Sequence, residues 1–402
     1  MKRFKGVKSK LLMALVAASI VATIAVPAAE AGVTVYQDGD KYVKLGGRIQ
    51  MQYHGQDPDS GSTTDDLKFR RLRPYIEGSL HKDWMGKFQW DMGDATGDNE
   101  IAIKDAYMQY KGFKNIKITL GNAYTPFSRE TMTSSKYQQL VERTFVGDHN
   151  YGAPDRNLGV HVTGSLAGKK LTYGISAASA SIDPDDDKLD FDTPVNNASD
   201  FNEGRMIGAR LDYHPFGFLK MSQGDFSGDL KATIGVAAFS WQNDDDNNTY
   251  TTVATGLDKG AGDVSDTKQD KADIDSVKGF EISGAIRGRG ASVDAQYNRF
   301  SVDTVDSTYS RGIFKNGDTT LTNLAVEGGY MVIPDKLEIV AAYQSQDADS
   351  YATEWTRNSV GFNYFFEKHD VKAQVTYRMG KDLDGIKGND EDEVFVQAQY
   401  VF

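Results

Sequence analysis

The sequence contains no cysteine and, beyond residue 31, no run of apolar residues that approaches eighteen in length. Without cysteine the chain can form neither a disulfide framework nor a thiolate metal site. Without a long apolar run it is predicted to have no transmembrane helix. Proline is scarce, whereas Gly, Tyr and Phe are abundant and clusters of Asp and Asn punctuate the chain. This composition fits an exported all-β protein.

The chain also lacks a basic excess. It has 45 Lys and Arg against 57 Asp and Glu, which gives a formal net charge of −12. Nothing supplies the broad basic surface that binding to DNA or RNA requires, so the composition argues against nucleic acid as a partner. Any chemistry directed at anions has to be local.

The first 31 residues have the pattern of an export signal. Five basic residues up to Lys10 precede an apolar run from Leu11 to Val26, and Ala29-Glu30-Ala31 resembles a cleavage site. We therefore expect a cleaved signal peptide over residues 1–31 and a mature domain over residues 32–402. The signal holds five basic residues and one acidic residue, so cleavage would leave a net charge of −16.

The segment from Phe69 to Leu80 shows an alternation that recurs along the chain. With a period of two, one face holds Leu72, Pro74, Ile76, Gly78 and Leu80, and the other holds Arg71, Arg73, Tyr75, Glu77 and Ser79. About sixteen segments of about ten residues, from Tyr42 to Phe402, repeat this pattern, which is typical of membrane-spanning β-strands. Short connections alternate with longer polar ones.

These segments predict an all-β fold, a transmembrane antiparallel β-barrel of about 16 strands. Only a closed barrel satisfies every backbone N–H and C=O in lipid, so the repeated apolar face becomes the outer wall. The terminal strand, Val394 to Phe402, resembles the signal read by the machinery that inserts barrels. Aromatic residues near strand ends suggest an interfacial girdle; these are Trp84, Trp90, Tyr110, Trp241, Tyr330, Tyr343, Trp355, Phe362 and Tyr364.

The same alternation assigns the charged side chains to the lumen, because a charge on the lipid face would cost about 2–4 kcal/mol at mid-depth. The predicted lumen cations are Lys44, Arg48, Arg71, Arg73, Lys87, Lys117, Arg210, Lys231, Arg287, Arg357, Lys372 and Arg378. The predicted lumen carboxylates are Glu77, Asp91, Asp105, Asp212, Glu281, Asp294, Glu327 and Glu338. The excess is positive, and arginine presents a planar, permanently charged fork to phosphate.

Several motifs resemble the phosphate-selective porin O and P family. They are Leu45 to Gln50, the Phe69 to Leu80 strand, Lys104 to Tyr107, Leu120 to Ser128, and the ending from Gly361 to Phe402. The resemblance implies a sixteen-stranded outer-membrane barrel, usually a trimer, with its third extracellular loop folded inward as a constriction. It also implies a ladder of arginines that conducts anions along the lumen.

The alternation stops from Ala123 to Asn157, and this segment is the expected constriction loop. It carries Arg129, Lys136, Arg143 and Arg156, and also Glu130, Glu142, Asp148 and Asp155. With four cations and four anions among these residues, the loop has no net charge. For the barrel wall we name Arg48, Arg71, Arg73, Lys87, Lys117 and Arg210 as the anion pathway.

The expected function is passive diffusion of small anions, with phosphate or related oxyanions favoured. If the lumen arginines pair with the lumen carboxylates, a general diffusion porin with weak selectivity results instead, and a porin for organic acids is another alternative. A barrel enzyme, such as an outer-membrane protease or phospholipase, belongs to a different class. Its catalytic groups would come from distant strands.

We expect no catalytic residue, cofactor or metal site, because the chain shows no nucleophile motif, no phosphate-binding glycine loop and no histidines at metal spacing. The acidic runs Asp183 to Asp187, Asp244 to Asp246 and Glu391 to Glu393 could bind Ca²⁺ or bridge lipopolysaccharide, but solvated loops are the better interpretation. The expected partners are small phosphate-like anions, membrane lipid, lipopolysaccharide, the insertion machinery and further copies of the chain.

Overall fold

A computed structural model describes residues 32–93, 101–183, 188–196, 202–244 and 272–402. The expected signal peptide, residues 184–187 of the first acidic run, and Asp245 and Asp246 lie outside the described residues. Sixteen antiparallel strands form a closed ring, which confirms the predicted fold class. They are β2 (Lys41–Pro58), β3 (Thr64–His81), β4 (Trp84–Asp91), β5 (Ala102–Tyr110), β6 (Ile116–Tyr124), β7 (Arg156–Leu166), β8 (Leu171–Asp183), β10 (Glu203–Tyr213), β11 (Lys231–Asn243), β12 (Ile274–Gly288), β13 (Ala291–Thr304), β14 (Asp318–Ile333), β15 (Leu337–Asp347), β16 (Trp355–Glu367), β17 (Val371–Lys381) and β18 (Glu391–Val401).

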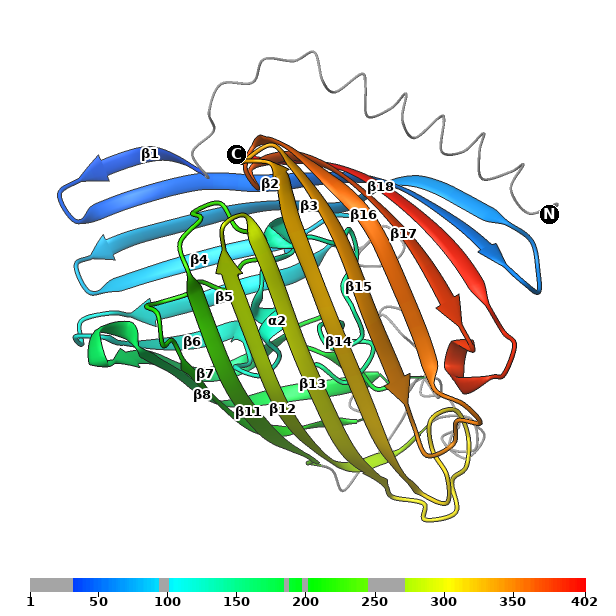
Figure 1. The fold of residues 1–402 in the computed structure, drawn as a ribbon. Coiled ribbons are helices and arrows are strands. Elements are labelled where there is room, and N and C mark those ends of the chain that lie inside the picture. The colour runs from blue at the N-terminus through cyan, green and yellow to red at the C-terminus, as the bar shows by residue number, and fades with distance from the viewer. Residues whose placement is uncertain (1–31, 94–100, 184–187, 197–201, 245–271) are drawn as a thin grey trace.

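The ring closes where the last strand meets the first. β18 pairs with β2 in the register Gln399↔Gln50, and β8 pairs with β10 in the register Gly174↔Arg210. Two short strands add to the ring at its edges: β1 (Val33–Asp38) pairs with the start of β2, and β9 (Asp190–Asp192) pairs with the end of β8. Figure 1 shows the tilted strands arranged side by side as a barrel.

Side chains alternate across this wall as the sequence predicts. On β10, Ile207 is 66% exposed and faces outward, whereas the preceding Met206 is 1% exposed and faces inward. The exposed side chains of the wall are largely aliphatic and aromatic. This apolar outer surface suits hydrocarbon, because strand residues that face lipid must be apolar.

The two ends of the barrel differ. The short-turn end holds Phe402 and the turns that join β3 to β4, β5 to β6 and β7 to β8. The opposite, long-loop end holds the connections β6–β7, β8–β10, β13–β14 and β17–β18. One connection at the short-turn end is an exception in length, since residues 214–230 separate β10 from β11.

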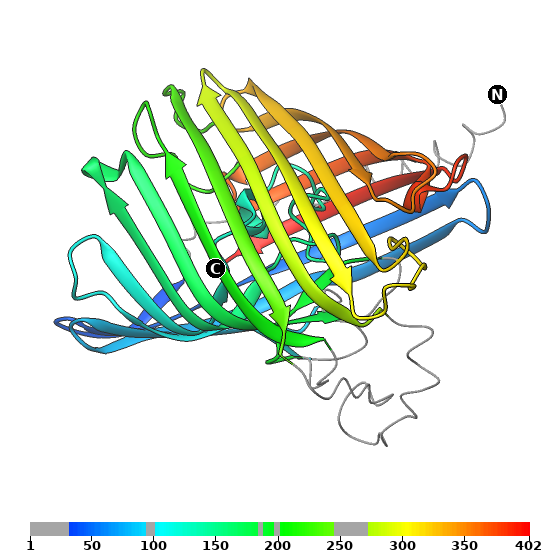
Figure 2. The same ribbon diagram turned by 90° about the horizontal axis from the view of Figure 1, so that it is seen from below.

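The β6–β7 connection, Thr125 to Asp155, is called the inner loop below. It contains the four-residue helix α2 (Arg129–Met132), which lies inside the barrel in both views (Figures 1 and 2). β6 extends to Tyr124 and β7 begins at Arg156, so Arg156 is a wall residue and not a loop residue. Among the described residues, no helix is long and apolar enough to cross a membrane.

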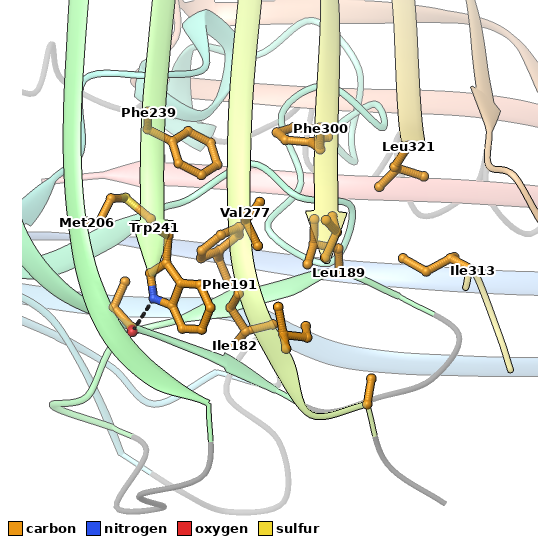
Figure 3. Packing of buried hydrophobic residues seen from close by; sticks show 14 of the residues in the cluster. Ile182, Leu189, Phe191, Met206, Phe239, Trp241, Val277, Phe300, Ile313 and Leu321 are labelled. Carbon is orange, nitrogen blue, oxygen red and sulfur yellow. Dashed lines mark hydrogen bonds between the residues drawn. The ribbon is translucent and has the colours of Figure 1, made fainter. Parts of the chain in front are cut away.

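An apolar cluster fills part of the barrel interior toward the long-loop end. Figure 3 shows Trp241, Phe239 and Phe300 from the wall packed with Leu189 and Phe191 from the β8–β10 connection. The Trp241 Nε1 donates a hydrogen bond to the Ala180 carbonyl (2.9 Å). The prediction that Trp241 and Trp355 belong to an interfacial girdle was therefore wrong, because their side chains are 0% and 4% exposed. Both side chains lie on the inward face of their strands, where loop residues cover them.

Candidate functional site

The inner loop starts and ends on the same side of the wall. Thr125 N donates to the Asp155 carbonyl (3.0 Å), and Thr125 Oγ1 donates to Asn157 Oδ1 (2.7 Å). Ser128 then begins α2, its Oγ accepting a hydrogen bond from Thr131 N (3.1 Å). Serine at this position satisfies one of the unpaired N–H groups of a first helical turn. The loop therefore leaves the wall in a fixed direction.

The middle of the loop is fastened to the far wall of the barrel. Gln139 Nε2 donates to Glu338 Oε1 on β15 (2.6 Å), and Val141 N donates to Thr376 Oγ1 on β17 (3.2 Å). Phe145 is fully buried and packs edge-on against the Trp355 ring on β16, with the ring centroids 4.7 Å apart. The loop thus crosses the lumen and leaves open space mainly beside β2 to β10.

Arg48 faces the loop without a carboxylate partner. Its Nη1 donates to Ser134 Oγ (3.0 Å) and Ser135 Oγ (2.8 Å), both on the loop. Its buried Nε has no hydrogen-bond partner. No ion pair of the described residues includes Arg48, so its charge is not neutralised by a contacting carboxylate.

Arg70 is a lumen residue that the alternation missed. The pairing of β2 with β3 runs Gln50↔Arg71 and then Met51↔Phe69, so a β-bulge skips Arg70. As a result Arg70 turns inward and forms a bidentate contact with Glu142 of the loop, with Nε–Oε1 at 2.7 Å. Arg71 Nη2 lies 3.6 Å from the same carboxylate. In a strand of a membrane barrel with a period of two, one of two adjacent arginines would face lipid. The adjacent Arg70 and Arg71 were therefore the sequence signal for a bulge.

Several predicted pathway residues lie in the lumen but are paired. Arg73 contacts Asp91 (Nε–Oδ2 2.5 Å), and Lys87 contacts Asp105 (Nζ–Oδ2 2.6 Å). Arg156 shares the Asp105 carboxylate (Nε–Oδ1 2.6 Å). Arg156 also contacts Asp155 (Nη1–Oδ1 3.0 Å), so Lys87 and Arg156 are paired with two carboxylates between them.

The cations of the opposite wall are also paired. Arg210 contacts Asp212 (2.8 Å) and Glu281 (2.7 Å). Arg129 of the loop contacts Asp294 (3.2 Å), a carboxylate that also binds Arg287.

The remaining predicted cations lie at other places in the lumen. Arg143 donates from Nη2 to the carbonyls of Thr131 and Thr133 (3.2 and 3.1 Å), so it braces the loop itself. Lys136 projects beside the Tyr137 ring, with Nζ 4.9 Å from the ring centroid. Lys117 is exposed near the short-turn end.

A cationic chamber of about 380 Å³ lies between the inner loop and the wall of β2 to β7. Five cations and two carboxylates line it: Lys44, Arg48, Lys87, Lys136, Arg156, Glu77 and Asp105. Tyr75, Tyr124 and Tyr137 complete much of its polar lining. Within the described part of the chain, this chamber brings together Arg48, Lys87, Lys136 and Arg156 from the predicted set, but not Arg71, Arg129 or Arg210.

The loop carboxylates titrate differently from one another. Burial would raise the pKa of Glu142, but Arg70 and Arg71 outweigh burial and hold that pKa well below its usual range. Burial raises the pKa of Glu130 to about 7, although Thr144 donates to this carboxylate from N (3.0 Å) and Oγ1 (2.5 Å). At neutral pH the loop therefore carries less negative charge than its four carboxylates suggest.

A segment that the sequence marked only as a connection also enters the lumen. Residues 214–230 extend from the short-turn end up to the inner loop. Gln223 N donates to the Tyr137 carbonyl of that loop (3.0 Å), and Gln223 Oε1 accepts from Gln139 N (2.6 Å). Arg287 Nη2 donates to the Ser222 carbonyl (2.9 Å). The inner loop is thus supported from below as well as from the wall.

Comparison with known proteins gives a family match and several structural likenesses. The model of a family described as phosphate-selective porin O and P matches residues 43–271, more than half of the chain. An uncharacterized protein of Aquifex aeolicus (strain VF5) is 23% identical over 395 residues, covering 90% of this chain and 86% of that protein.

Two solved structures share the barrel architecture. An anion-selective porin from Comamonas acidovorans has a TM-score of 0.59 at 12% identity and covers 90% of this chain and 100% of its own. OmpT of Vibrio cholerae in a trimer form has a TM-score of 0.54 at 14% identity, covering 90% of this chain and 99% of its own. At these identities the likeness shows the fold alone.

Proposed function

This chain belongs to the phosphate-selective porin O and P family and is an outer-membrane porin, and we propose that small anions, phosphate or related oxyanions foremost, diffuse through it passively. The observation that carries the proposal is the cationic chamber, with five cations against two carboxylates. A barrel of sixteen strands encloses enough space for a water-filled passage. We take the protein as a channel and not an enzyme.

Arg48 and Lys136 are the central residues of the proposed pathway. Both line the chamber, and neither takes part in an ion pair among the described residues. A guanidinium that is held by two serine hydroxyls can add a charge-assisted hydrogen bond to a passing oxyanion. Several weak sites in series pass an ion, whereas one tight site would trap it.

The other predicted cations have a supporting part in this proposal. Arg71, Arg73, Lys87 and Arg156 surround or adjoin the chamber and contribute a positive potential, while Arg129, Arg143 and Arg210 hold the inner loop in place. Lys117 would attract anions at the short-turn end.

A general diffusion porin with weak selectivity is the second candidate function. The ion pairs of Arg73, Arg129 and Arg210 favour it, since enclosed charges that neutralise each other give little selectivity. The two candidates differ in whether the unpaired cations of the chamber bind phosphate.

We propose further that residues 1–31 are removed as a signal peptide, that the short-turn end faces the periplasm, and that three copies assemble. The trimer form of the structurally similar Vibrio cholerae OmpT supports the last of these. The insertion machinery would recognise the strand Val394 to Phe402, and the long-loop end would face lipopolysaccharide.

The test is single-channel recording in a planar bilayer under a KCl gradient, with phosphate titrated in. The double variant Arg48→Gln/Lys136→Gln is compared with Lys381→Gln, which removes a cation whose side chain is 64% exposed at the long-loop end. We expect phosphate to block chloride current in the native channel. The half-blocking concentration should rise about tenfold in the double variant, equivalent to ~1.4 kcal/mol, and stay unchanged in the control.

A native channel with large current that phosphate does not block, or with cation selectivity, would contradict the phosphate proposal and leave the general porin. Phosphate block that is equally strong in the double variant would remove Arg48 and Lys136 from the pathway.

A further inference from the structure

A second chamber of about 520 Å³ lies at the short-turn end, beneath the inner loop. The turns β5–β6 and β7–β8 and the β10–β11 connection surround it, and Pro126 and Met132 of the inner loop form its roof. We call it the apolar chamber. Its volume falls within the range of about 300–1,000 Å³ that is typical of small-molecule sites.

The lining of this chamber is mostly hydrocarbon, unlike that of the cationic chamber. The side chains that contribute it are Phe113, Ile116, Pro126, Met132, Phe218 and Leu219. Phe218 is 44% exposed and Phe113 is 54% exposed, so both rings present free surface. A solute that covers apolar surface in a water-filled pore is bound more tightly, because that surface is removed from water.

Several polar groups that line the chamber are already satisfied. The Arg210 guanidinium is held by Asp212 and Glu281 (2.8 and 2.7 Å). Leu219 N donates to His214 Nδ1 (3.4 Å), and His214 Nε2 lies 3.1 Å from Thr172 Oγ1. An Nδ1 that accepts leaves the proton on Nε2, so this imidazole is neutral. These groups therefore offer no unpaired charge to a solute.

Three lysines form the rim of the apolar chamber: Lys111, Lys117 and Lys169. All three are exposed. Lys169 Nζ lies 5.5 Å from the Phe218 ring centroid, which places a cation beside apolar surface. Among the ion pairs of the described residues, none includes Lys111, Lys117 or Lys169, so the three rim lysines have no contacting carboxylate.

We infer that the apolar chamber binds amphipathic organic anions, in which a carboxylate is attached to an aromatic ring or a short aliphatic chain. The ring or chain would cover Phe218, Leu219 and Met132, and the carboxylate would reach the rim lysines. Hydrocarbon alone would suit an uncharged solute, and lysines alone would suit any anion. Only their combination in one chamber selects an amphipathic anion.

This inference goes beyond the proposed phosphate pathway and does not depend on it. Phosphate has no apolar part and gains nothing from Phe218 or Met132. Arg48 and Lys136, which carry the phosphate proposal, line the other chamber. The two proposals can therefore fail separately.

The experiment is single-channel recording of the full-length channel, with benzoate, acetate or benzyl alcohol added at the same side. We expect benzoate to reduce chloride current at a concentration at least about tenfold lower than acetate, since only benzoate can cover apolar surface. Benzyl alcohol should be a weaker blocker than benzoate, because it lacks the charge that the rim lysines attract.

Two pairs of variants locate the effect. Phe218→Ser removes a ring of the chamber, and its control Phe216→Ser removes an exposed ring from the same connection that does not line the chamber. Lys117→Gln/Lys169→Gln removes two rim charges, and its control Lys381→Gln/Lys387→Gln removes two lysines from the long-loop end. All six positions are exposed or partly exposed, so the barrel should fold in every case.

We expect Phe218→Ser and the rim double variant each to raise the half-blocking benzoate concentration at least about fivefold, while both controls and Arg48→Gln leave it unchanged. Equal block by benzoate and acetate, equal block by benzoate and benzyl alcohol, or benzoate block that survives both chamber variants would each overturn the inference. Loss of phosphate block in Arg48→Gln with benzoate block retained would support both proposals.

Discussion

Glu142 is the residue on which the local charge balance of the inner loop depends most. Its carboxylate contacts Arg70 at 2.7 Å and Arg71 at 3.6 Å, and its side chain is 14% exposed. Removing one partner of a buried ion pair leaves an uncompensated charge, at a cost of about 3–5 kcal/mol. The same removal makes the lumen more positive.

Replacing Glu142 with Gln should therefore raise the permeability ratio of chloride over potassium and lower the thermal midpoint of the channel. Reversal potential and a thermal melt measure the two effects. Glu354→Gln removes the same charge from an exposed site and should change neither. An unchanged reversal potential in Glu142→Gln would mean that permeating ions do not sense this carboxylate.

His149 makes the stability of the inner loop depend on pH in the alkaline range. Burial lowers the pKa of His149, but Asp190, 2.6 Å from its Nδ1, and Asp148 outweigh burial and place the pKa at about 9. A raised folded-state pKa stabilises the fold fully below about 6.5, the unfolded value, and the stabilisation is lost as the pH rises through about 9. The imidazole is 38% exposed, so we expect at most about 1 kcal/mol.

Amide hydrogen exchange of residues 146–152 should thus accelerate between pH 7 and pH 10, after correction for intrinsic exchange. His149→Gln should exchange faster at pH 7 and show a smaller dependence on pH. Identical pH dependence in both proteins would exclude the His149–Asp190 pair as its origin.

At the scale of elements, the inner loop is held against the barrel wall by apolar side chains. Phe145 packs against Tyr151 and Trp355, and its N donates to Gln344 Oε1 (3.0 Å). Truncating a fully buried phenylalanine costs about 3–5 kcal/mol. Here the loss falls on the docking of the loop and not on the strand ladder.

The variant Phe145→Ala should increase open-channel current noise and the mean conductance, since residues 140–146 would leave the wall more often. Phe280→Ala, on the outward face of β12 with its side chain 48% exposed, is the matched control. Single-channel recording measures both. Native-like noise and conductance would show that hydrogen bonds alone hold the loop.

At the scale of the whole molecule, Phe402 extends the pairing of β18 with β2 that closes the barrel. Phe402 exchanges two backbone hydrogen bonds with Gly47 (2.8 and 3.0 Å). A side chain at position 47 would meet the Phe402 ring, since a Cβ there would lie 2.8 Å from Cζ. The same Cβ would lie 3.0 Å from the Arg73 carbonyl oxygen, so glycine at position 47 allows Phe402 and β3 to approach β2 closely.

Deleting Phe402 should reduce the fraction of chain that assembles into a closed barrel, measured by heat-modifiable electrophoretic mobility. Phe402→Tyr retains the backbone pairing and an aromatic ring and should assemble normally. Equal assembly of the deletion variant would show that β18 closes the ring without its final residue.

The whole molecule also determines which parts of the lumen are filled by side chains and which stay open. The apolar cluster occupies the side of β8 and β10 to β14, and the inner loop covers β12 to β17. The two chambers remain beside β2 to β10. Solutes therefore have an asymmetric path, although the wall is a continuous ring.

The wall of the barrel follows from the sequence because lipid imposes a simple rule. Every second side chain must be apolar, so the strand count, the inward positions of Arg48, Arg73 and Arg210, and an interruption over Ala123 to Asn157 could be predicted, although Arg156 belongs to the wall. The interior obeys no such rule. Apolar Trp241 and charged Arg210 both face inward, and their sequence pattern does not distinguish them.

Only the tertiary structure decided which cations stay unpaired, because pairing depends on distances between residues far apart in the chain. It turned Arg70 inward through a bulge, paired Arg73 with Asp91, and left Arg48 facing two serines of the inner loop. It also raised residues 214–230 into the lumen and so formed the apolar chamber. The sequence determined a barrel with charges inside it, since the cost of charge in lipid acts on each residue separately. The path through that barrel was determined by packing, which acts on residues together.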